Sequence, residues 1–122
     1  MKVLIADDEE ILRISLEGIL KSSGKELEID FAINGEEACQ KAKSSKYDII
    51  LLDLNMPKKD GYEVLKEVRS ANITTPIIFI TATGEPKKVM ESIAHYKLSG
   101  FIEKPFTTEK VLDIVNKAVG NK

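Results

Sequence analysis

Acidic, hydroxyl and amine side chains stand at the ends of short apolar runs in this chain. Asp7 and Asp8 follow the first run, and Asp53, Thr81 and Lys104 end or follow three later ones. Three carboxylates brought close together repel one another, so such a site needs a cation, raised pKa values, or both. Oxygen-only ligands favour Mg²⁺, Mn²⁺ or Ca²⁺ over softer metals. The chemistry predicted for these residues is therefore divalent-cation binding, with room for phosphate oxygens beside the ion.

These residues are positioned by a regular alternation of strand-like and helix-like segments. Apolar runs predict strands at Lys2–Ala6, Leu27–Ala32, Asp48–Leu52, Pro76–Ile80 and Gly100–Glu103. Amphipathic segments predict helices at 10–22, 35–44, 61–71, 86–97 and 108–119. Strict alternation of this kind is typical of a parallel sheet that helices cover on both faces.

The character of the strands predicts their order in the sheet. Three runs, Val3–Ile5, Ile49–Leu52 and Ile77–Ile80, are apolar throughout and should lie in the centre. The second strand alternates in polarity and the fifth is short, so both should be edges. With right-handed crossovers, the prediction is an α/β fold with a doubly wound five-stranded parallel sheet of order 2-1-3-4-5, which is flavodoxin-like. The acids after the first strand should then converge with Asp53 at the carboxyl edge.

Local signals mark where the helices begin. Asn34 is a predicted N-cap, with Glu37 three residues later as its capping-box partner. Asp60 and Thr107 are predicted to cap the helices that follow them, and Pro86 suits a first helical turn.

Length and composition indicate a single domain over residues 1–122. Hydrophobic residues make up 43% of the chain, which is enough for a packed core. The net charge of −2 gives no general attraction to nucleic acid or anionic lipid. No apolar run approaches the roughly 20 residues that span a bilayer, and no signal peptide is evident. We therefore expect a cytoplasmic protein without membrane insertion, and the single Cys39 fits a reducing compartment.

Four motifs taken together resemble the receiver domains of two-component response regulators. They are the acidic pair Asp7-Asp8, the run Asp53-Leu54-Asn55-Met56-Pro57-Lys58-Lys59-Asp60-Gly61, the pair Thr81-Ala82 and the tripeptide Lys104-Pro105-Phe106. The resemblance covers the whole chain. It implies a phosphorylation switch that takes a phosphoryl group from a histidine kinase or a histidine phosphotransfer protein. It also implies an unidentified downstream protein partner and no direct binding of nucleic acid.

The resemblance assigns roles to the acidic residues and the lysine. Asp53 corresponds to the phosphoacceptor and to a ligand of Mg²⁺, or of Mn²⁺ in its place. Asp8 would bind the ion directly, Asp7 largely through water, and Asn55 through its backbone carbonyl. Lys104 would pair with Asp53 and then with the phosphoryl group, and the peptide bond that follows this lysine is expected to be cis. In this reading the protein catalyses only its own phosphorylation and dephosphorylation, so it is not an enzyme acting on other substrates.

Further residues correspond to the family's switch. Thr81 would donate its hydroxyl to a phosphoryl oxygen, and Phe101 occupies the aromatic switch position three residues before the lysine. Their movement would change the surface formed by the last two predicted helices and the strand between them. Asn55 and Thr83 occupy positions that tune dephosphorylation in the family. For Phe101, core packing without switching stays open as an alternative.

The segment before the last strand departs from the family pattern. Receivers usually carry Gly-Ala there, whereas this chain has Lys97-Leu98-Ser99-Gly100. The stretch from Thr81 to Lys104 is one residue longer than usual. This departure bears on the end of the helix predicted at 86–97 and not on the acidic residues.

Three other functions share some of these features. A small phosphohydrolase of the haloacid-dehalogenase type also uses an Asp nucleophile and Mg²⁺, but its nucleophile follows the first strand as Asp-x-Asp, a spacing that Asp7-Asp8-Glu9 breaks. A flavodoxin needs a phosphate-binding loop after that strand, where these acids would repel the phosphate. A constitutive interaction module would not require the complete set of acids, threonine and lysine.

The first predicted helix carries two apolar stripes. One consists of Leu12, Leu16, Ile19 and Leu20 and is suited to packing on the sheet. A weaker one consists of Ile11, Ile14, Ser15 and Gly18. The weaker stripe has two interpretations: it packs against the last helix, or it docks the helices of a kinase or phosphotransfer protein.

Overall fold

The computed structural model describes residues 1–82 and 86–120. Within these residues lie five strands: β1 (Lys2–Ala6), β2 (Glu28–Ala32), β3 (Ile49–Asp53), β4 (Ile77–Thr81) and β5 (Gly100–Glu103). They alternate with helices α1 (Glu10–Lys21), α2 (Gly35–Ser44), α3 (Gly61–Ser70), α4 (Pro86–Tyr96) and α5 (Thr108–Ala118). The strands are parallel and form one sheet in the order β2-β1-β3-β4-β5.

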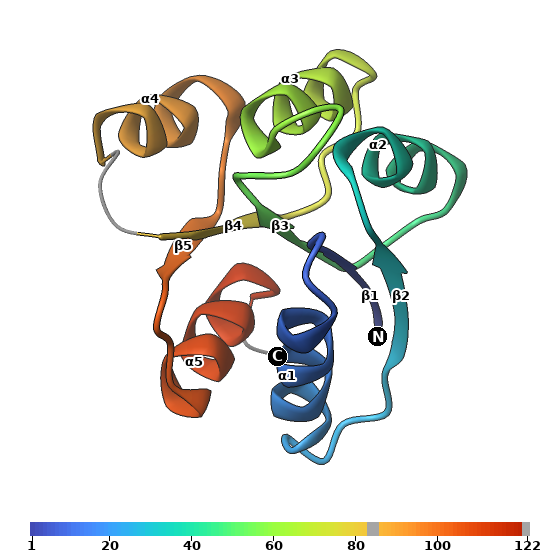
Figure 1. Cartoon of the computed structure of the whole chain (residues 1–122), viewed down its shortest axis with the longest axis vertical. Helices are drawn as coiled ribbons and strands as arrows, with labels where there is room; N and C mark the ends of the chain where they lie inside the picture. The colour runs from blue at the N-terminus through green and yellow to red at the C-terminus, as the bar shows by residue number, and fades with distance from the viewer. Residues whose placement is uncertain (83–85, 121–122) are drawn as a thin grey trace.

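Helices cover both faces of the sheet. α1 and α5 lie on one face, and α2, α3 and α4 lie on the other (Figure 1). Alternate strand residues supply the two cores: Ile5 and Leu51 pack with Val111 of α5, whereas Leu52 packs with Leu65 of α3. None of the helices in the described residues combines the length and the apolar character that a membrane crossing requires.

The burial of the strands confirms the order expected from their composition. β3 and β4 are buried at every position, because helices cover both of their faces. β2 and β5 keep partly exposed positions and form the two edges. The predicted bounds of strands and helices differ from the observed ones by at most one residue. The flavodoxin-like (βα)₅ architecture is therefore confirmed.

Side-chain caps fix the starts of three helices. Asp60 and Glu63 form a complete capping box at α3, and Thr107 accepts a hydrogen bond from Lys110 N at α5. At α2 the Asn34 side chain accepts from Glu37 N, as expected. The predicted capping box, in which the Glu37 side chain would accept a hydrogen bond from Asn34 N, is wrong. The Glu37 carboxylate accepts from Ile33 N at 3.3 Å instead.

Gly61 allows α3 to begin directly against the end of β3. A Cβ atom at this position would lie 2.8 Å from the carbonyl oxygen of Asp53 and 2.9 Å from Leu54 Cα. Both contacts are with backbone, which has little freedom to move aside. The backbone N–H of Gly61 also donates to the Leu54 carbonyl at 2.9 Å. The close approach of this helix start therefore fixes the backbone that carries Asp53.

We expect Gly61→Ala to lower the free energy of unfolding by about 2 kcal/mol, because the added methyl group overpacks the end of β3. Gly18→Ala is the matched control, since Gly18 lies within α1 and a Cβ there meets nothing within 4 Å. That substitution should raise stability by up to about 1 kcal/mol through helix propensity. Urea unfolding measures both variants. A Gly61→Ala protein as stable as the control would contradict the packing argument.

Candidate functional site

Three carboxylates meet at the carboxyl edge of the sheet. Oxygen atoms of Asp7, Asp8 and Asp53 lie within 4.8 Å of one another. They come together because β1 and β3 are neighbouring parallel strands that end at the same edge. Asp7 is 0% exposed and Asp53 is 2% exposed, whereas Asp8 is open to solvent. The convergence predicted from sequence is thus present in the structure.

The Asp7 carboxylate is held from one side only. Its Oδ1 accepts a hydrogen bond from Glu9 N at 2.9 Å, while its buried Oδ2 has no hydrogen-bond partner among the described residues. Burial raises the pKa of Asp7 to about 7; the Glu9 hydrogen bond opposes this rise, and the charge of Asp53 adds to it. Burial thus favours the neutral form of this carboxyl far more than exposure to water would.

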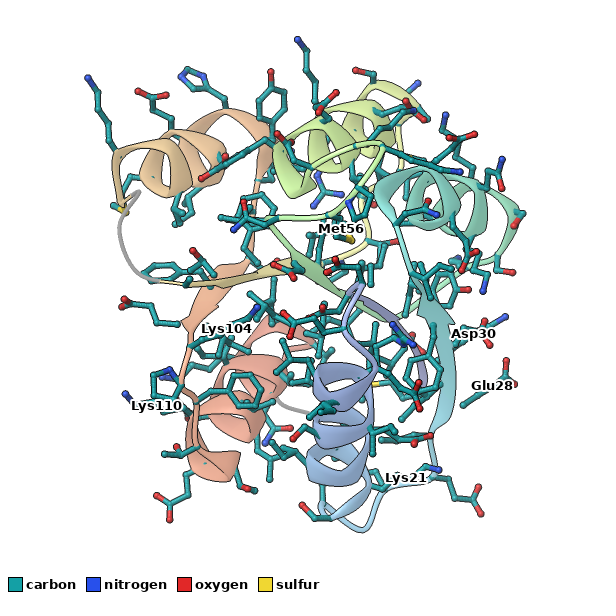
Figure 2. All side chains as sticks on the ribbon, in the orientation of Figure 1. Lys21, Glu28, Asp30, Met56, Lys104 and Lys110 are labelled. Atoms are coloured by element: carbon teal, nitrogen blue, oxygen red, sulfur yellow. The ribbon has the colours of Figure 1, made fainter. Side chains whose placement is uncertain are left out.

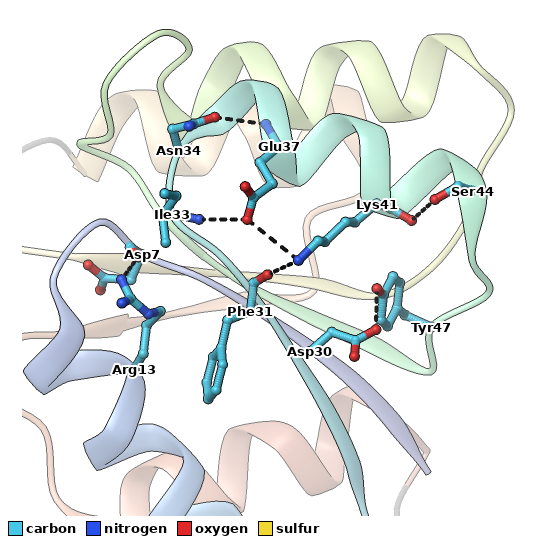
Figure 3. Close-up of polar contacts among 10 residues, drawn as sticks. All are labelled: Asp7, Arg13, Asp30, Phe31, Ile33, Asn34, Glu37, Lys41, Ser44 and Tyr47. Atoms are coloured by element: carbon cyan, nitrogen blue, oxygen red, sulfur yellow. Dashed lines mark hydrogen bonds and ion pairs between the residues drawn. The ribbon is translucent and has the colours of Figure 1, made fainter.

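A cation from α1 fixes the backbone at Asp7. The Arg13 guanidinium donates from Nη1 to the Asp7 carbonyl oxygen at 2.8 Å, and Figure 3 shows this contact. The guanidinium carbon also lies 6.0 Å from the centre of the Phe31 ring. Sequence reasoning missed Arg13, because nothing in its spacing distinguishes it from the other basic residues of the chain. The residue helps to hold the turn that carries the acidic pair.

Besides the other two carboxylates, Asp53 contacts a backbone N–H and a lysine ammonium group. Its Oδ1 accepts a hydrogen bond from Asn55 N at 3.1 Å, and its Oδ2 lies 3.6 Å from Lys104 Nζ. Lys104 follows β5 directly (Figure 2), and its backbone N–H donates to the Thr81 carbonyl at 2.8 Å. The Lys104–Pro105 peptide bond is cis, as the resemblance implied. The Lys104 ammonium group, at the end of β5, therefore lies beside the buried Asp53 carboxylate at the end of β3.

Thr81 and Phe101 lie on the α2–α4 face of the sheet. Strand alternation puts Thr81 on the same face as Phe79, which pairs in register with Phe101. The Thr81 hydroxyl donates to the Ala82 carbonyl at 2.5 Å. Phe101 is half-buried and packs against the core of that face. The remaining predicted site residue, Thr83, lies outside the described residues.

The donor set fits a hard divalent cation. Carboxylate oxygens converge from the ends of two strands. Oδ2 of Asp7, buried and without a hydrogen-bond partner within residues 1–82 and 86–120, is the kind of acceptor that a cation or its bound water satisfies. Asn55 follows Asp53 by two residues, so its carbonyl is near enough in sequence to join such a set. Mg²⁺ bound through one or two carboxylates retains waters and leaves positions for phosphate oxygens.

Comparisons with known proteins identify sequences similar to nearly all of this chain. The profile of the response regulator receiver domain family matches residues 3–116. The two-component response regulator ORR41 of Oryza sativa is 34% identical over 96% of this chain and 93% of its own length. The chemotaxis protein CheY of Bacillus subtilis is 33% identical over 97% of both chains.

Solved structures agree with the sequence comparisons. The receiver domain of the Francisella response regulator 1452 superposes with a TM-score of 0.87 at 28% identity, over 98% of this chain and 97% of its own. The chemotaxis protein CheY4 of Vibrio cholerae gives a TM-score of 0.84 at 34% identity, over 96% of this chain and 97% of its own.

We expect Asp7→Asn to stabilise the metal-free protein at high pH. The folded pKa of Asp7 lies above its unfolded value of 3.8, so the folded state holds more protons between about pH 4 and pH 7. Stability from this carboxyl is therefore present below pH 4 and is lost as the pH rises through 7. The substitution removes that loss, by roughly 1–3 kcal/mol at pH 8, and should give no gain from this source at pH 4.

Urea unfolding in the presence of a chelator, at pH values from 4 to 8, measures this difference. Asp113→Asn on the exposed face of α5 is the control, because it removes a carboxylate without changing the buried edge. A gain for Asp7→Asn that does not depend on pH would contradict the assignment.

Proposed function

The chain belongs to the response regulator receiver domain family, and on that basis we propose that it accepts a phosphoryl group on Asp53 from a histidine kinase or a histidine phosphotransfer protein. Receiver domains are signalling modules of two-component systems rather than enzymes that turn over external substrates. The observation that carries the proposal is the buried Asp53 carboxylate with Lys104 Nζ at 3.6 Å and two further carboxylates beside it. Residues 1–122 would act as one receiver unit, and the free, buried Cys39 fits the reducing cytoplasm as its compartment.

The proposed transfer is an in-line displacement at phosphorus. An Asp53 oxygen attacks, a phosphorus–oxygen bond forms as the phosphorus–nitrogen bond of phosphohistidine breaks, and the departing imidazole nitrogen takes up a proton. The backbone N–H of Asn55 fixes the Asp53 carboxylate for this attack by binding its other oxygen. Lys104 offsets negative charge on the transferred group. Positioning and electrostatics account for most of the catalysis in phosphoryl transfer.

Asp7, Asp8, Asp53 and the Asn55 carbonyl would hold Mg²⁺, which supplies positive charge to the phosphoryl oxygens and permits the carboxylates to stay charged side by side. Oδ2 of Asp7 supports this assignment, since it lies buried beside the other two carboxylates and has no hydrogen-bond partner in the part of the chain that the structure describes. Mn²⁺ has the same preference for oxygen ligands and serves as a substitute in experiments.

The proposed switch begins at Thr81. In the structure its hydroxyl is bound to the Ala82 carbonyl, so it must leave that partner to reach a phosphoryl oxygen on Asp53. An aspartyl phosphate adds negative charge and acceptor oxygens, which favour this movement. Phe101 lies on the same face and can move into the space that Thr81 leaves. The change would then reach a downstream protein through the surface of α4, β5 and α5.

We expect a small acyl phosphate to label the wild-type protein with one phosphoryl group per chain when Mg²⁺ is present. Asp53→Asn should lower labelling by more than roughly 100-fold, because it removes the nucleophile. Asp113→Asn, an exposed carboxylate on α5, is the matched control and should label normally. Intact-mass measurement with and without a chelator gives the result. Many turnovers of added phosphate esters would support the phosphohydrolase alternative and overturn the proposal.

The exposed stripe on α1 is the proposed docking surface for the phosphoryl donor. Ile11 is 80% exposed and Ile14 is 56% exposed, although α1 lies beside α5 (Figure 1). Packing against α5 therefore does not account for these two side chains. An apolar surface beside the phosphoacceptor edge suits the helices of a kinase or phosphotransfer protein.

We expect Ile14→Glu to slow transfer from a phosphorylated histidine phosphotransfer domain roughly tenfold, because it places a charge in an apolar contact. Labelling by a small acyl phosphate should be unchanged, since that donor needs no docking surface. Met90→Glu is the control, because Met90 is equally exposed but lies on α4. Reactions with each donor, quenched at set times, give the rate of phosphoryl transfer to each variant. An equal loss with both donors would show damage to the site rather than loss of docking.

A further inference from the structure

The loop between β3 and α3, residues 54–60, carries the proposed carbonyl ligand and contains a constrained turn. Lys58 has φ 71°, in the left-handed region that non-glycine residues seldom adopt, and the Lys59 N–H donates to the Pro57 carbonyl at 2.8 Å. The left-handed conformation brings the Cβ atom of a lysine close to the following carbonyl oxygen, so it is strained. Contacts from the rest of the fold must therefore hold this turn.

The start of α2 supports one side of the turn. A Cβ atom on Gly35 would lie 2.0 Å from the Lys59 carbonyl oxygen, so only glycine permits the observed approach. The Gly35 N–H also faces the Pro57 carbonyl, at 3.3 Å. These two contacts join the first residue of α2 to both ends of the short segment 57–59. The turn is thus packed against backbone rather than against a flexible side chain.

An ion pair from α3 supports the other side. Lys59 Nζ binds the Glu67 carboxylate through Oε1, and Lys43 of α2 binds the same carboxylate through Oε2 at 2.7 Å. The two lysines, Lys43 first, lower the pKa of Glu67 to about 2, so it stays charged across the physiological range. Glu67 therefore links the loop to α3 through one oxygen and links α2 to α3 through the other.

We propose that Gly35 and the Lys59–Glu67 ion pair are positioning elements for the divalent cation, because they hold the 54–60 loop, which carries the proposed Asn55 carbonyl ligand and bonds to Asp53 through Asn55 N. This inference rests on the proposed metal site. These contacts involve none of the carboxylates that would hold the ion, so they support the loop independently of those ligands. Loss of either contact should appear as a weaker affinity for the ion, and not as a lower rate once the ion is bound.

The two lysines on Glu67 provide a matched pair of variants. Lys59→Gln removes the link to the loop, whereas Lys43→Gln removes only the link between α2 and α3. We expect Lys59→Gln to weaken Mn²⁺ binding about threefold, a size typical for loss of a partly exposed ion pair. Lys43→Gln should bind Mn²⁺ as the wild type does, and Lys59→Arg should restore wild-type affinity by keeping the charge. Electron paramagnetic resonance of free Mn²⁺ measures the dissociation constants, with Mg²⁺ as competitor.

Two further measurements separate positioning from general destabilisation. Urea unfolding without metal should show similar small changes for Lys59→Gln and Lys43→Gln. Labelling of Lys59→Gln by the acyl phosphate should return to the wild-type rate at saturating metal. Gly35→Ala, which pushes on the Lys59 carbonyl directly, should weaken Mn²⁺ binding about tenfold where it folds.

Equal Mn²⁺ affinities for Lys59→Gln and Lys43→Gln would overturn this inference, and so would a loss of labelling that saturating metal does not restore. Failure of the wild-type protein to bind Mn²⁺ or Mg²⁺ would instead overturn the proposed metal site itself. The two failures are therefore distinguishable in one set of titrations.

Discussion

The repulsion between carboxylates at a buried sheet edge is the constraint on which the rest of this structure depends. Asp7 and Asp53 are almost completely removed from water, and a third acid stands beside them. The Lys104 ammonium group, whose Nζ lies 3.6 Å from Asp53 Oδ2, offsets part of this negative charge. The pKa of Asp7 is raised to about 7, which reduces the negative charge on that carboxyl. A folded protein keeps such a cluster only where the surrounding backbone cannot rearrange to separate the charges.

The fold supplies that rigidity through elements that are themselves apolar and buried. β3 and β4 lie under helices on both faces, so Asp53 is carried by a strand that has no freedom to move toward solvent. α3 begins against the backbone of β3 at Gly61, where no side chain fits. Arg13 holds the backbone at the end of β1 from α1. The rigid surrounding backbone therefore keeps the mutually repelling carboxylates together.

The parts of the site that sequence could predict are those encoded by local pattern. Runs that are apolar throughout predict central strands. In a parallel sheet the polar residues that follow such strands lie at one edge, and this reasoning predicts the convergence of Asp53 with Asp7 and Asp8. The prediction that Glu37 completes a capping box is wrong, because its carboxylate accepts a hydrogen bond from Ile33 N instead. Arg13 and Glu67 were not foreseen, because their partners are set by tertiary packing and neither has a distinctive spacing.

The segment before β5 leads the chain from the end of α4 directly back into the sheet. α4 ends at Tyr96, and Lys97 then takes φ 54°, a left-handed residue that ends the helix. Arg69 of α3 holds this end by donating to the Tyr96 carbonyl at 2.7 Å and to the Lys97 carbonyl at 3.3 Å. The chain re-enters the sheet at once, since Ser99 N donates to β4. β5 then pairs in register with β4, and Lys104, which follows β5, has its Nζ 3.6 Å from an Asp53 carboxylate oxygen at the carboxyl edge of the sheet.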